Sequence, residues 1–437
     1  MVGKNTWTMS TLEHALAGVI VRTLGNTTGA DLGPVCTDSR QVRQGSVFVA
    51  LKGERFDGHD YAAQAARDGA SVVVVERDTG ASCPQIIVRD TQEALGALAR
   101  AWRSQFAVPV ICVVGSNGKT TTTQMIASIL RSFVGESRVV ATEKNYNNHI
   151  GVPLTLLAMT RDVEFGIVEM GASACGEIAL LCSIAEPNYG IVTNIGRAHL
   201  EGFGGPEGVR RGKGELYDWL ARTGGRVFVP ANDPVLMSMA AERETLAAEC
   251  YPTTLADGVE HHLEGDYNRF NVAAAVAVGR YFGVDDERIR YAVGSYRPDN
   301  HRSQKIRTGQ NTLILDCYNA NPSSMQASLV NFRQEPLEGC TRKILILGDM
   351  LELGDWSDAE HRHIISLAAE IPDARILLVG PHFAKAYRSL ESRPADTTLY
   401  PSQEVLAAEL RKHPVSQALI LVKGSHSIGL ERLADLL

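Results

Sequence analysis

The stretch VICVVGSNGKTTTTQMIASILRSF, residues 110–133, decides the fold of this 437-residue chain. It opens on the apolar run 110–114, which predicts a buried strand, and breaks at the glycine-containing run 115–118. Apolar side chains then recur at helical spacing, at Ile126, Ile129, Leu130 and Phe133. A strand, a glycine loop and a helix in this order leave unpaired backbone N–H groups and the positive end of a helix dipole at the loop. The stretch therefore predicts a phosphate site.

The side chains of the loop fit a nucleotide. Lys119 supplies a positive charge for the outer phosphates, and the hydroxyl of Thr120 stands where a magnesium ligand is needed. We expect the nucleotide contacts to come from Gly115, Ser116, Asn117, Gly118, Lys119, Thr120 and Thr121. The longer P-loop pattern has glycine where this chain has Val113, so only the shorter form G-S-N-G-K-T matches. A glycine turn followed by a surface lysine is the alternative interpretation.

Length and composition limit the classes of protein that need to be considered. A chain of 437 residues is expected to form two or three domains. The net charge of −7 and a pI near 6.0, without a basic run, give no footprint for nucleic acid. No apolar run approaches 18 residues and the first ten residues lack an apolar segment, so we expect neither a membrane span nor a signal peptide. We expect a monomer in the cytoplasm.

The cysteines do not indicate a disulfide framework or a zinc site. There are 8 of them in the whole chain, and Cys112 and Cys182 lie inside apolar runs. No Cys-x-x-Cys pair occurs. We therefore expect reduced cysteines in the core.

The first ninety residues alternate between strand and helix patterns and predict a small α/β unit. The expected strands are Ser46–Leu51, Ser71–Glu76 and Gln85–Asp90. Thr91 is the expected cap of a helix that carries Leu95, Leu98 and Trp102 and leads into the P-loop strand. We place a domain boundary near residue 95.

The same alternation continues to the end of the chain and predicts parallel sheets with right-handed crossovers. The expected central strands are Val110–Val114, Val139–Ala141, Phe165–Glu169, Tyr189–Asn194 and Arg226–Val229. The expected C-terminal strands are Thr312–Leu315, Lys343–Leu347, Arg375–Val379 and Ala418–Val422. Polar residues such as Glu169 and Asp316 stand at the carboxyl ends of these strands, where ligands of such sheets collect. The polar run 295–303 is the expected hinge between the two units.

Several segments after the P-loop are more specific than the loop itself. They are Asn145–Pro153 (NYNNHIGVP), Glu169–Ala172 (EMGA), Ala198–Gly204 (AHLEGFG) and Lys213–Glu215 (KGE). Together they resemble the Mur ligase family. Asp316–Met325 (DCYNANPSSM) and Leu347–Gly354 (LGDMLELG) resemble the branch of that family that adds D-alanyl-D-alanine. The resemblance extends from Thr37–Arg40 to Val422–Ser425, nearly the whole chain.

The resemblance implies an α/β fold of three domains. Residues 1–95 would form a small domain that binds the UDP end of a substrate, and residues 96–297 a P-loop ATPase domain with a parallel sheet. Residues 298–437 would form a Rossmann-like domain on the D-alanyl-D-alanine side. The implied activity is an ATP-dependent amide ligase of peptidoglycan synthesis. It would phosphorylate the carboxylate of UDP-MurNAc-tripeptide to an acyl phosphate, which the amine of D-alanyl-D-alanine then attacks.

The resemblance also assigns the catalytic residues Lys119, Glu169, His199 and Lys213. Lys119 would hold the β- and γ-phosphates of ATP, Thr120 and Glu169 the first magnesium ion, and His199 a second one. A free ammonium at Lys213 would repel magnesium, but the matching lysine of the family is carbamylated, and this modification makes it an anion. We therefore expect ATP, Mg²⁺ and a carbamylated Lys213.

Other contacts are carried over from the family on weaker matches. Asn271, Arg302 and Asp316 match contacts to adenine and ribose, although a helix cap, a solvated charge and a turn residue are the respective alternatives. Expected substrate contacts are Ser39, Arg40, Asp57, Gly58, His59, Asn145, Asn147, Asn148, Asn319, Asn321, Asp349 and Lys423. Ordinary polar turns are the alternative for those in the first domain. Val114 departs from the family, which usually has threonine there.

Two other classes of function stay open. One is a related ligase that adds a single amino acid, or a folylpolyglutamate synthetase. The chain lacks the Asp-Asn-Pro-Arg motif of diaminopimelate-adding relatives, and its long first domain argues against the synthetase. The other class is a P-loop switch or scaffold that hydrolyses ATP without ligation, which would leave His199, Lys213 and the segment 145–153 unexplained.

Overall fold

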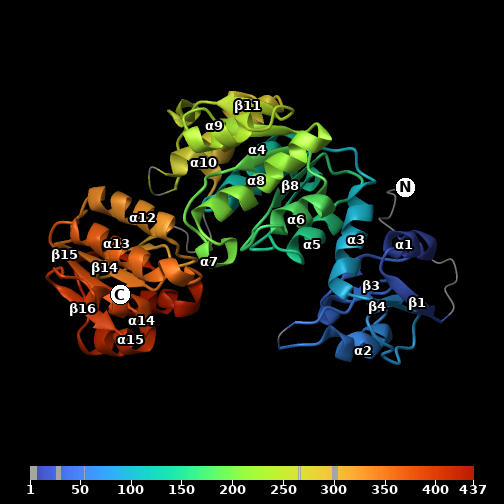
Figure 1. Ribbon diagram of the computed structural model, residues 1–437, viewed down its shortest axis with the longest axis horizontal. Helices are drawn as coiled ribbons and strands as arrows, with labels where there is room; N and C mark the ends of the chain where they lie inside the picture. The colour runs from blue at the N-terminus through green and yellow to red at the C-terminus, as the bar shows by residue number, and fades with distance from the viewer. Residues whose placement is uncertain (1–6, 26–30, 54, 264, 266, 298–303) are drawn as a thin grey trace.

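The computed structural model describes residues 7–25, 31–53, 55–263, 265, 267–297 and 304–437. Stretch 110–133 folds as predicted, with β6 (Val110–Val114) followed by a loop and by α4 (Lys119–Val134). Within the described residues, three sheets follow one another along the chain, each flanked by helices. The expected three-domain α/β fold is confirmed (Figure 1).

The first sheet has the strand order β1-β5-β4-β3-β2, in which only β1 is antiparallel to its neighbour. Its strands are β1 (Ile20–Leu24), β2 (Val35–Cys36), β3 (Val47–Val49), β4 (Val72–Val75) and β5 (Gln85–Val88). Its helices are α1 (Met9–Leu16), α2 (Ala62–Arg67) and α3 (Thr91–Arg103), with the short 3₁₀ helices η1 (Ser39–Gln41) and η2 (Gly58–Tyr61). The cap of α3 is Asp90 and not Thr91 as predicted, because the Asp90 carboxylate accepts from the backbone of Gln92 and Glu93.

The central sheet has the order β11-β10-β9-β6-β8-β7 and all its pairings are parallel, as predicted. Its strands are β6, β7 (Val139–Ala141), β8 (Phe165–Glu169), β9 (Tyr189–Val192), β10 (Arg226–Pro230) and β11 (Ala247–Tyr251). Its helices are α4, α5 (Gly151–Leu157), α6 (Glu177–Ala185), α7 (Leu200–Phe203), α8 (Pro206–Thr223), α9 (Pro234–Ala241), α10 (Asn268–Tyr281) and α11 (Asp286–Ser295), with η3 (Glu136–Arg138) and η4 (Thr253–Ala256).

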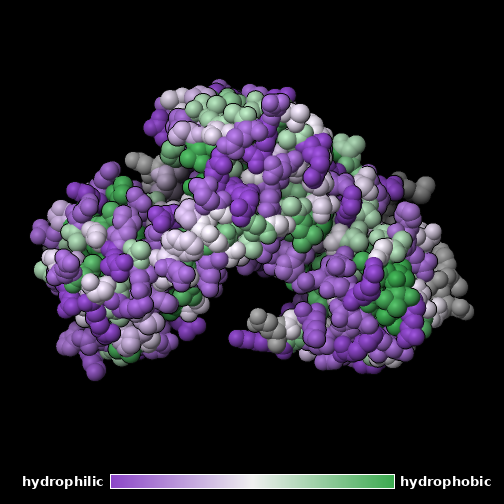
Figure 2. Space-filling model, viewed as in Figure 1, coloured by the Kyte–Doolittle hydropathy of each residue, from purple (hydrophilic) through white to green (hydrophobic). Residues whose placement is uncertain are grey.

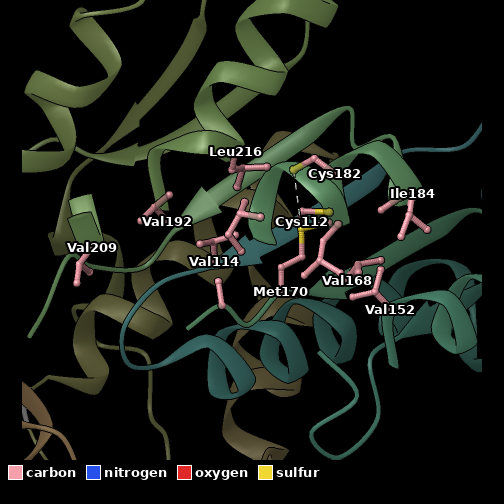
Figure 3. Packing of buried hydrophobic residues seen from close by; sticks show 14 of the residues in the cluster. Cys112, Val114, Val152, Val168, Met170, Cys182, Ile184, Val192, Val209 and Leu216 are labelled. Carbon is pink, nitrogen blue, oxygen red and sulfur yellow. Dashed lines mark hydrogen bonds between the residues drawn. The ribbon is translucent and has the colours of Figure 1, made fainter. Parts of the chain in front are cut away.

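Strand β6 is buried on both faces, which explains its continuous apolar run. Ile111 and Val113 belong to the apolar cluster that includes α4 and α10. Cys112 and Val114 face the opposite layer, which contains Leu216 of α8 (Figure 3). All eight cysteines are free, and Cys112, Cys182 and Cys317 are buried, as expected. The prediction of core positions is wrong for Cys175 and Cys250, which are exposed.

The third sheet has the order β12-β13-β17-β14-β15-β16, and only β12 is antiparallel to its neighbour. Its strands are β12 (Gln304–Arg307), β13 (Thr312–Leu315), β14 (Arg342–Gly348), β15 (Ala374–Val379), β16 (Thr397–Tyr400) and β17 (Ala418–Lys423). Its helices are α12 (Pro322–Gln334), α13 (Ser357–Ala369), α14 (Pro381–Arg388) and α15 (Gln403–Lys412), with η5 (Gly354–Trp356), η6 (His426–Ile428) and η7 (Leu430–Leu436).

The first and third domains lie on either side of the central one (Figure 1). Figure 2 shows an open hollow between them. The predicted boundary at residue 95 falls inside α3, which packs both on α1 and on α5 and α6. The predicted hinge lies mostly outside the described residues. No described helix is both long enough and apolar enough to cross a membrane.

Candidate active site

The loop between β6 and α4 is a tight backbone cradle. Gly118 precedes the first residue of α4 with φ of 79°, and an added Cβ would lie 2.3 Å from Oδ1 of Asn271. At Gly115, where φ is 149°, an added Cβ would lie 1.9 Å from Oγ1 of Thr193. Both positions therefore require glycine, and the N–H groups at the start of α4 keep the room that a phosphate needs.

The end of β9 holds this loop in place. The side-chain oxygen of Asn194 accepts from the backbone N–H of Asn117 at 3.1 Å, and its amide group donates back to the carbonyl of Asn117 at 2.9 Å. The backbone N–H of Gly196 donates to Oγ of Ser116 at 2.9 Å. The ammonium of Lys119 lies over the loop and donates to the carbonyl of Gly115 at 2.9 Å. The polar end of β9 therefore anchors the phosphate loop.

Glu169, at the carboxyl end of β8, lies next to the first turn of α4. Its carboxylate is 1% exposed and accepts from Oγ1 of Thr120 and from Nδ2 of Asn147, both at 2.7 Å. These two donors are neutral, so they orient the carboxylate without cancelling its charge. The structure thus brings together both residues predicted for the first magnesium ion and one residue of the predicted substrate loop.

Lys213 lies inside α8 with 1% of its surface exposed, and its ammonium stacks 5.0 Å from the ring centre of Phe203. Burial lowers the pKa of this amine from 10.5 to about 7, and repulsion by Lys119 adds to the shift. Much of the amine is therefore neutral at neutral pH. Only a neutral amine can react with carbon dioxide.

His199 is the residue directly before α7, with φ of 53°, and its side chain contacts the third domain. Its Nδ1 is hydrogen-bonded to the carboxylate of Glu352, and this bond lowers the pKa of Glu352. Glu352 lies in the segment 347–354 that indicated the family, but no role was predicted for it. The separation of 153 residues left no local signal for this pair.

Among the described residues, no group of three or more His, Cys, Asp or Glu side chains is arranged to hold a metal ion. Thr120, Glu169 and His199 therefore do not form a closed cage of protein ligands. Magnesium usually binds through one or two carboxylates and completes its shell with phosphate oxygens and water. A buried carboxylate beside a threonine at the phosphate loop fits that pattern.

The third domain contacts the phosphate loop directly. Nδ2 of Asn321, the cap of α12, donates to Oδ1 of Asn117 at 2.9 Å, and the backbone N–H of Arg197 donates to Oγ of Ser323 at 2.8 Å. A cavity of about 240 Å³ opens beside these contacts. Its polar lining comes from both domains and includes His199, Asn319, Asn321, Glu352, Ser425 and His426. Ser425 and His426 were not among the predicted residues.

Two of the three residues predicted to contact adenine and ribose, Asn271 and Asp316, belong to the central and the third domain respectively. Asn271 of α10 is buried against Gly118 and accepts from Oγ1 of Thr122 at 3.2 Å, so it supports the loop and is not a helix cap. Asp316 follows β13, where Lys423 donates to its carboxylate at 2.6 Å. A crevice beside Asp316 holds only about 10 Å³, the room of one water. Arg302 lies outside the described residues.

The predicted residues of the first domain form two polar turns. In the first, Asp38 caps η1, which begins at Ser39, and pairs with the exposed guanidinium of Arg40 at 2.8 Å. In the second, Asp57 caps η2 and accepts from Nδ1 of His59 at 2.5 Å, while Nε2 of His59 accepts from the backbone N–H of Glu76 at 2.8 Å.

The buried His59 therefore has both ring nitrogens occupied within the protein, which leaves no ring atom for a ligand. Gly58 is required by close packing, because an added Cβ would lie 2.6 Å from the carbonyl oxygen of Leu51. The exposed Arg40 is the predicted residue of this domain that is best placed to reach a substrate.

Several of the other predicted substrate residues also serve the fold. Asn148 accepts from the backbone of Ile150 and Gly151 ahead of α5, whereas Asn145 is exposed. Asp349 is 1% exposed and accepts from the backbone N–H groups of His382 and Phe383, at the start of α14. Lys423 is 2% exposed and also donates to the carbonyl of Asn319 at 3.4 Å. Contact of these residues with a substrate stays a prediction.

Comparison with known proteins agrees with this geometry. The family descriptions "Mur ligase family, catalytic domain", "Mur ligase middle domain" and "Mur ligase, glutamate ligase domain" match residues 34–103, 113–251 and 301–426. A UDP-N-acetylmuramoyl-tripeptide--D-alanyl-D-alanine ligase of Bacillus subtilis is 33% identical, covering 91% of this chain and 92% of that protein.

Two solved structures are similar over most of the chain. A crystal structure of MurF from Acinetobacter baumannii matches with a TM-score of 0.86 and 31% identity, covering 100% of this chain and 99% of the other. A MurF ligase from Thermotoga maritima, in complex with ADP, matches with a TM-score of 0.77 and 26% identity, covering 92% and 96%. With the phosphate loop, the Thr120–Glu169 pair and the buried Lys213 in place, the chain belongs to the Mur ligase family.

Proposed function

We propose that the protein joins D-alanyl-D-alanine to UDP-MurNAc-tripeptide and converts ATP to ADP and phosphate, in the cytoplasmic part of peptidoglycan synthesis. The observation that carries this proposal is the buried Glu169 carboxylate, held 2.7 Å from Thr120 at the phosphate loop of a chain that resembles ligases of this name over nearly its full length. A ligase of this kind needs charge-stabilising groups around the phosphoryl group, because ATP, the carboxylate that it phosphorylates and the product phosphate are all anions.

ATP, when bound, supplies the phosphoryl group that makes the carboxylate of the tripeptide reactive as an acyl phosphate. The loop 115–118 would hold the phosphates through its backbone N–H groups, since both glycines keep the cradle free of side chains. Lys119 donates to the carbonyl of Gly115 over the loop, and its ammonium would bind the outer phosphates when ATP is present. The chain's part in the reaction is therefore to position and neutralise charge.

Magnesium, when bound, neutralises the phosphate oxygens. We assign Thr120 and Glu169 as the protein ligands of a first magnesium ion and His199 as the protein ligand of a second, with phosphate and water as the other ligands. Asn147 would keep Glu169 oriented through the hydrogen bond between its Nδ2 and the carboxylate. The carbamate of Lys213 would add a further anion near this charge. The lowered pKa of about 7 supports this modification, because it provides a neutral amine at neutral pH.

The acceptor dipeptide would enter the 240 Å³ cavity at the domain seam. The cavity is polar and lined from both domains, and it includes His199 beside the site that binds phosphate. A zwitterionic dipeptide suits such a lining better than an apolar ligand does. Asn319 and Asn321 are the predicted substrate residues that lie here.

Phosphate release by the purified protein tests the proposal. We expect release with ATP, Mg²⁺ and UDP-MurNAc-tripeptide to depend strictly on added D-alanyl-D-alanine. Release that ignores both substrates would overturn the proposal in favour of an ATP-hydrolysing switch. Acceptance of a single free amino acid in place of the dipeptide would show a related ligase instead.

A further inference from the structure

A loop of the third domain, residues 351–356, lies against residues 199–205 of the central domain. We call residues 351–356 the docking loop. The backbone N–H of Glu201 donates to the carbonyl of Glu352 at 3.2 Å. A Cβ added to Gly205 would lie 2.9 Å from the ring of Trp356, so the indole packs directly on this glycine. In Figure 1, α7 lies at the end of the central domain that faces the third domain.

The two residues that meet at this contact both have an unusual backbone. His199 has φ of 53° and Glu352 has φ of 61°, in the left-handed region that side chains other than glycine rarely adopt. Such conformations cost free energy and persist when the surroundings enforce them, and they are concentrated at functional sites. Their side chains are joined by the hydrogen bond between Nδ1 of His199 and the carboxylate of Glu352. The left-handed backbones of His199 and Glu352 thus occur at the two ends of one side-chain hydrogen bond.

The donor and the acceptor in the hydrogen bond between His199 and Glu352 can be assigned. A carboxylate accepts a hydrogen bond, so Nδ1 of His199 is the donor, and in the neutral ring Nε2 then keeps its lone pair. Histidines that bind metal ions commonly donate their other N–H to a carboxylate, which fixes the ring orientation and raises the basicity of the ligand nitrogen. The carboxylate here comes from a different domain from the histidine, so the arrangement depends on docking.

We propose that Glu352 is a positioning residue that fixes the ring and tautomer of His199, so that Nε2 becomes a metal ligand only when the third domain is docked. The inference rests on the proposed function and adds that metal binding at His199 depends on docking of the third domain. The domain that carries the acceptor side would complete the second magnesium site. Phosphoryl transfer would then be slow until the acceptor domain is in place, which protects ATP from futile hydrolysis.

The rival explanation is that Glu352 only helps to hold the two domains together and does not orient His199. The chain contains a matched control for this explanation. Arg197 and Glu360 form an ion pair across the same two domains, close in sequence to His199 but without contact between Glu360 and the histidine. Glu360→Gln removes the charge of this ion pair but leaves the backbone bond between Glu201 and Glu352 and the packing of Trp356 on Gly205, so the domains should stay docked. Glu352→Ala removes the partner of His199, whereas Glu352→Gln keeps an oxygen that can accept from Nδ1.

The test combines two readouts on the full chain. The first is ¹⁵N NMR of the histidine rings, which reports the tautomer of His199 and needs no metal, with His199→Gln to assign its signal. The second is Mn²⁺ binding to the ADP-bound protein, followed by electron paramagnetic resonance. We expect Glu352→Ala to abolish the Nδ1–H tautomer and weaken the weaker Mn²⁺ site about 10- to 100-fold. Glu352→Gln and Glu360→Gln should keep the tautomer, with Mn²⁺ affinity within about threefold of the parent.

The kinetic constants should also separate Glu352→Ala from the other two variants. Glu352→Ala should lower kcat about 10- to 100-fold with little change in the KM for ATP. The inference is overturned if Glu352→Ala keeps the tautomer and both Mn²⁺ affinities, or if Glu360→Gln causes the same losses. A parent protein that binds two Mn²⁺ ions but makes no amide bond would instead refute the proposed function, so the two failures are distinguishable.

Discussion

Burial of the Lys213 amine destabilises the fold, although the proposed function needs this amine at the site. Its amine has a pKa of about 7 in the folded protein and about 10.5 when the chain is unfolded, because burial disfavours the charged form. Between these values the unfolded chain holds more protons than the folded one. The free energy of unfolding therefore rises with pH between about 7 and 10.5. Below pH 7 the full cost of burying the charged amine remains.

We predict that Lys213→Met abolishes ligation but raises the thermal midpoint of the ligand-free protein by a few degrees in buffer free of carbon dioxide. The gain should be largest at or below pH 7 and should shrink towards pH 10, because the parent lysine then folds without losing a proton. Differential scanning calorimetry across this range measures it. Lys412→Met removes the same charge from an exposed position and should change neither property. A midpoint that falls in Lys213→Met would contradict the account.

Glu169 should matter through its charge. Glu169→Gln keeps the size of the side chain but places an amide N–H against one of the two donors, Thr120 and Asn147. We expect kcat/KM for ligation to fall about 10²- to 10³-fold, the usual effect of removing one preorganised charge-stabilising group. The exposed Glu164, which directly precedes β8 at the end opposite Glu169, gives the control: Glu164→Gln should behave like the parent. Full activity in Glu169→Gln would remove it from the magnesium site.

At the scale of elements, the start of α4 depends on a single glycine. We predict that Gly118→Ala lowers ADP affinity more than tenfold, because the added Cβ would meet Asn271 and push the first turn away from the phosphates. Gly224→Ala is the matched control. Gly224 has φ of 73° with open space around it, so it should cost only the backbone penalty of about 1–2 kcal/mol and leave ADP binding intact. Calorimetry of ADP binding compares the two; equal affinities would contradict the cradle.

The start of α14 gives a test of Asp349. Because its carboxylate is buried and accepts from two backbone N–H groups, we expect Asp349→Ala to destabilise the protein by about 1–2 kcal/mol, as loss of a helix cap does. Denaturant unfolding measures this. A large increase in the KM for the dipeptide without loss of stability would instead support the substrate contact predicted from the sequence.

The sequence predicts buried elements well and edge elements poorly. Strands β6, β8 and β13 have the predicted bounds because they lie inside their sheets and are buried along their whole length. The edge strand β7 was also predicted, because its sequence VVA is wholly apolar. Strands β1 (IVRTL) and β12 (QKIR) were not predicted, because an edge strand mixes polar and apolar residues. Thr120 and Glu169 could be paired in advance, since parallel strands end at one sheet edge. The contact of His199 with Glu352 could not, because it depends on how two domains dock.

At the scale of the whole molecule, an open hollow separates the first domain from the third (Figure 2). A purine at the predicted site beside Asp316 would need more room than the crevice of about 10 Å³ there, so we expect the seam to adjust when nucleotide binds. We predict that ATP analogue and UDP-MurNAc-tripeptide together reduce the radius of gyration measured by small-angle X-ray scattering. Either ligand alone should give a smaller change. An unchanged scattering curve with both ligands bound would contradict domain closure.

The central claim is that the phosphate loop activates a carboxylate for attack by an amine. It is tested most directly with UDP-MurNAc-tripeptide whose reacting carboxylate carries ¹⁸O, incubated with ATP, Mg²⁺ and D-alanyl-D-alanine. In the proposed reaction a carboxylate oxygen bonds to phosphorus and leaves with it when the amine forms the amide. Mass spectrometry should therefore find one ¹⁸O in the released phosphate, with one amide product for each ADP. Phosphate without ¹⁸O, or ADP formed without amide, would contradict the account.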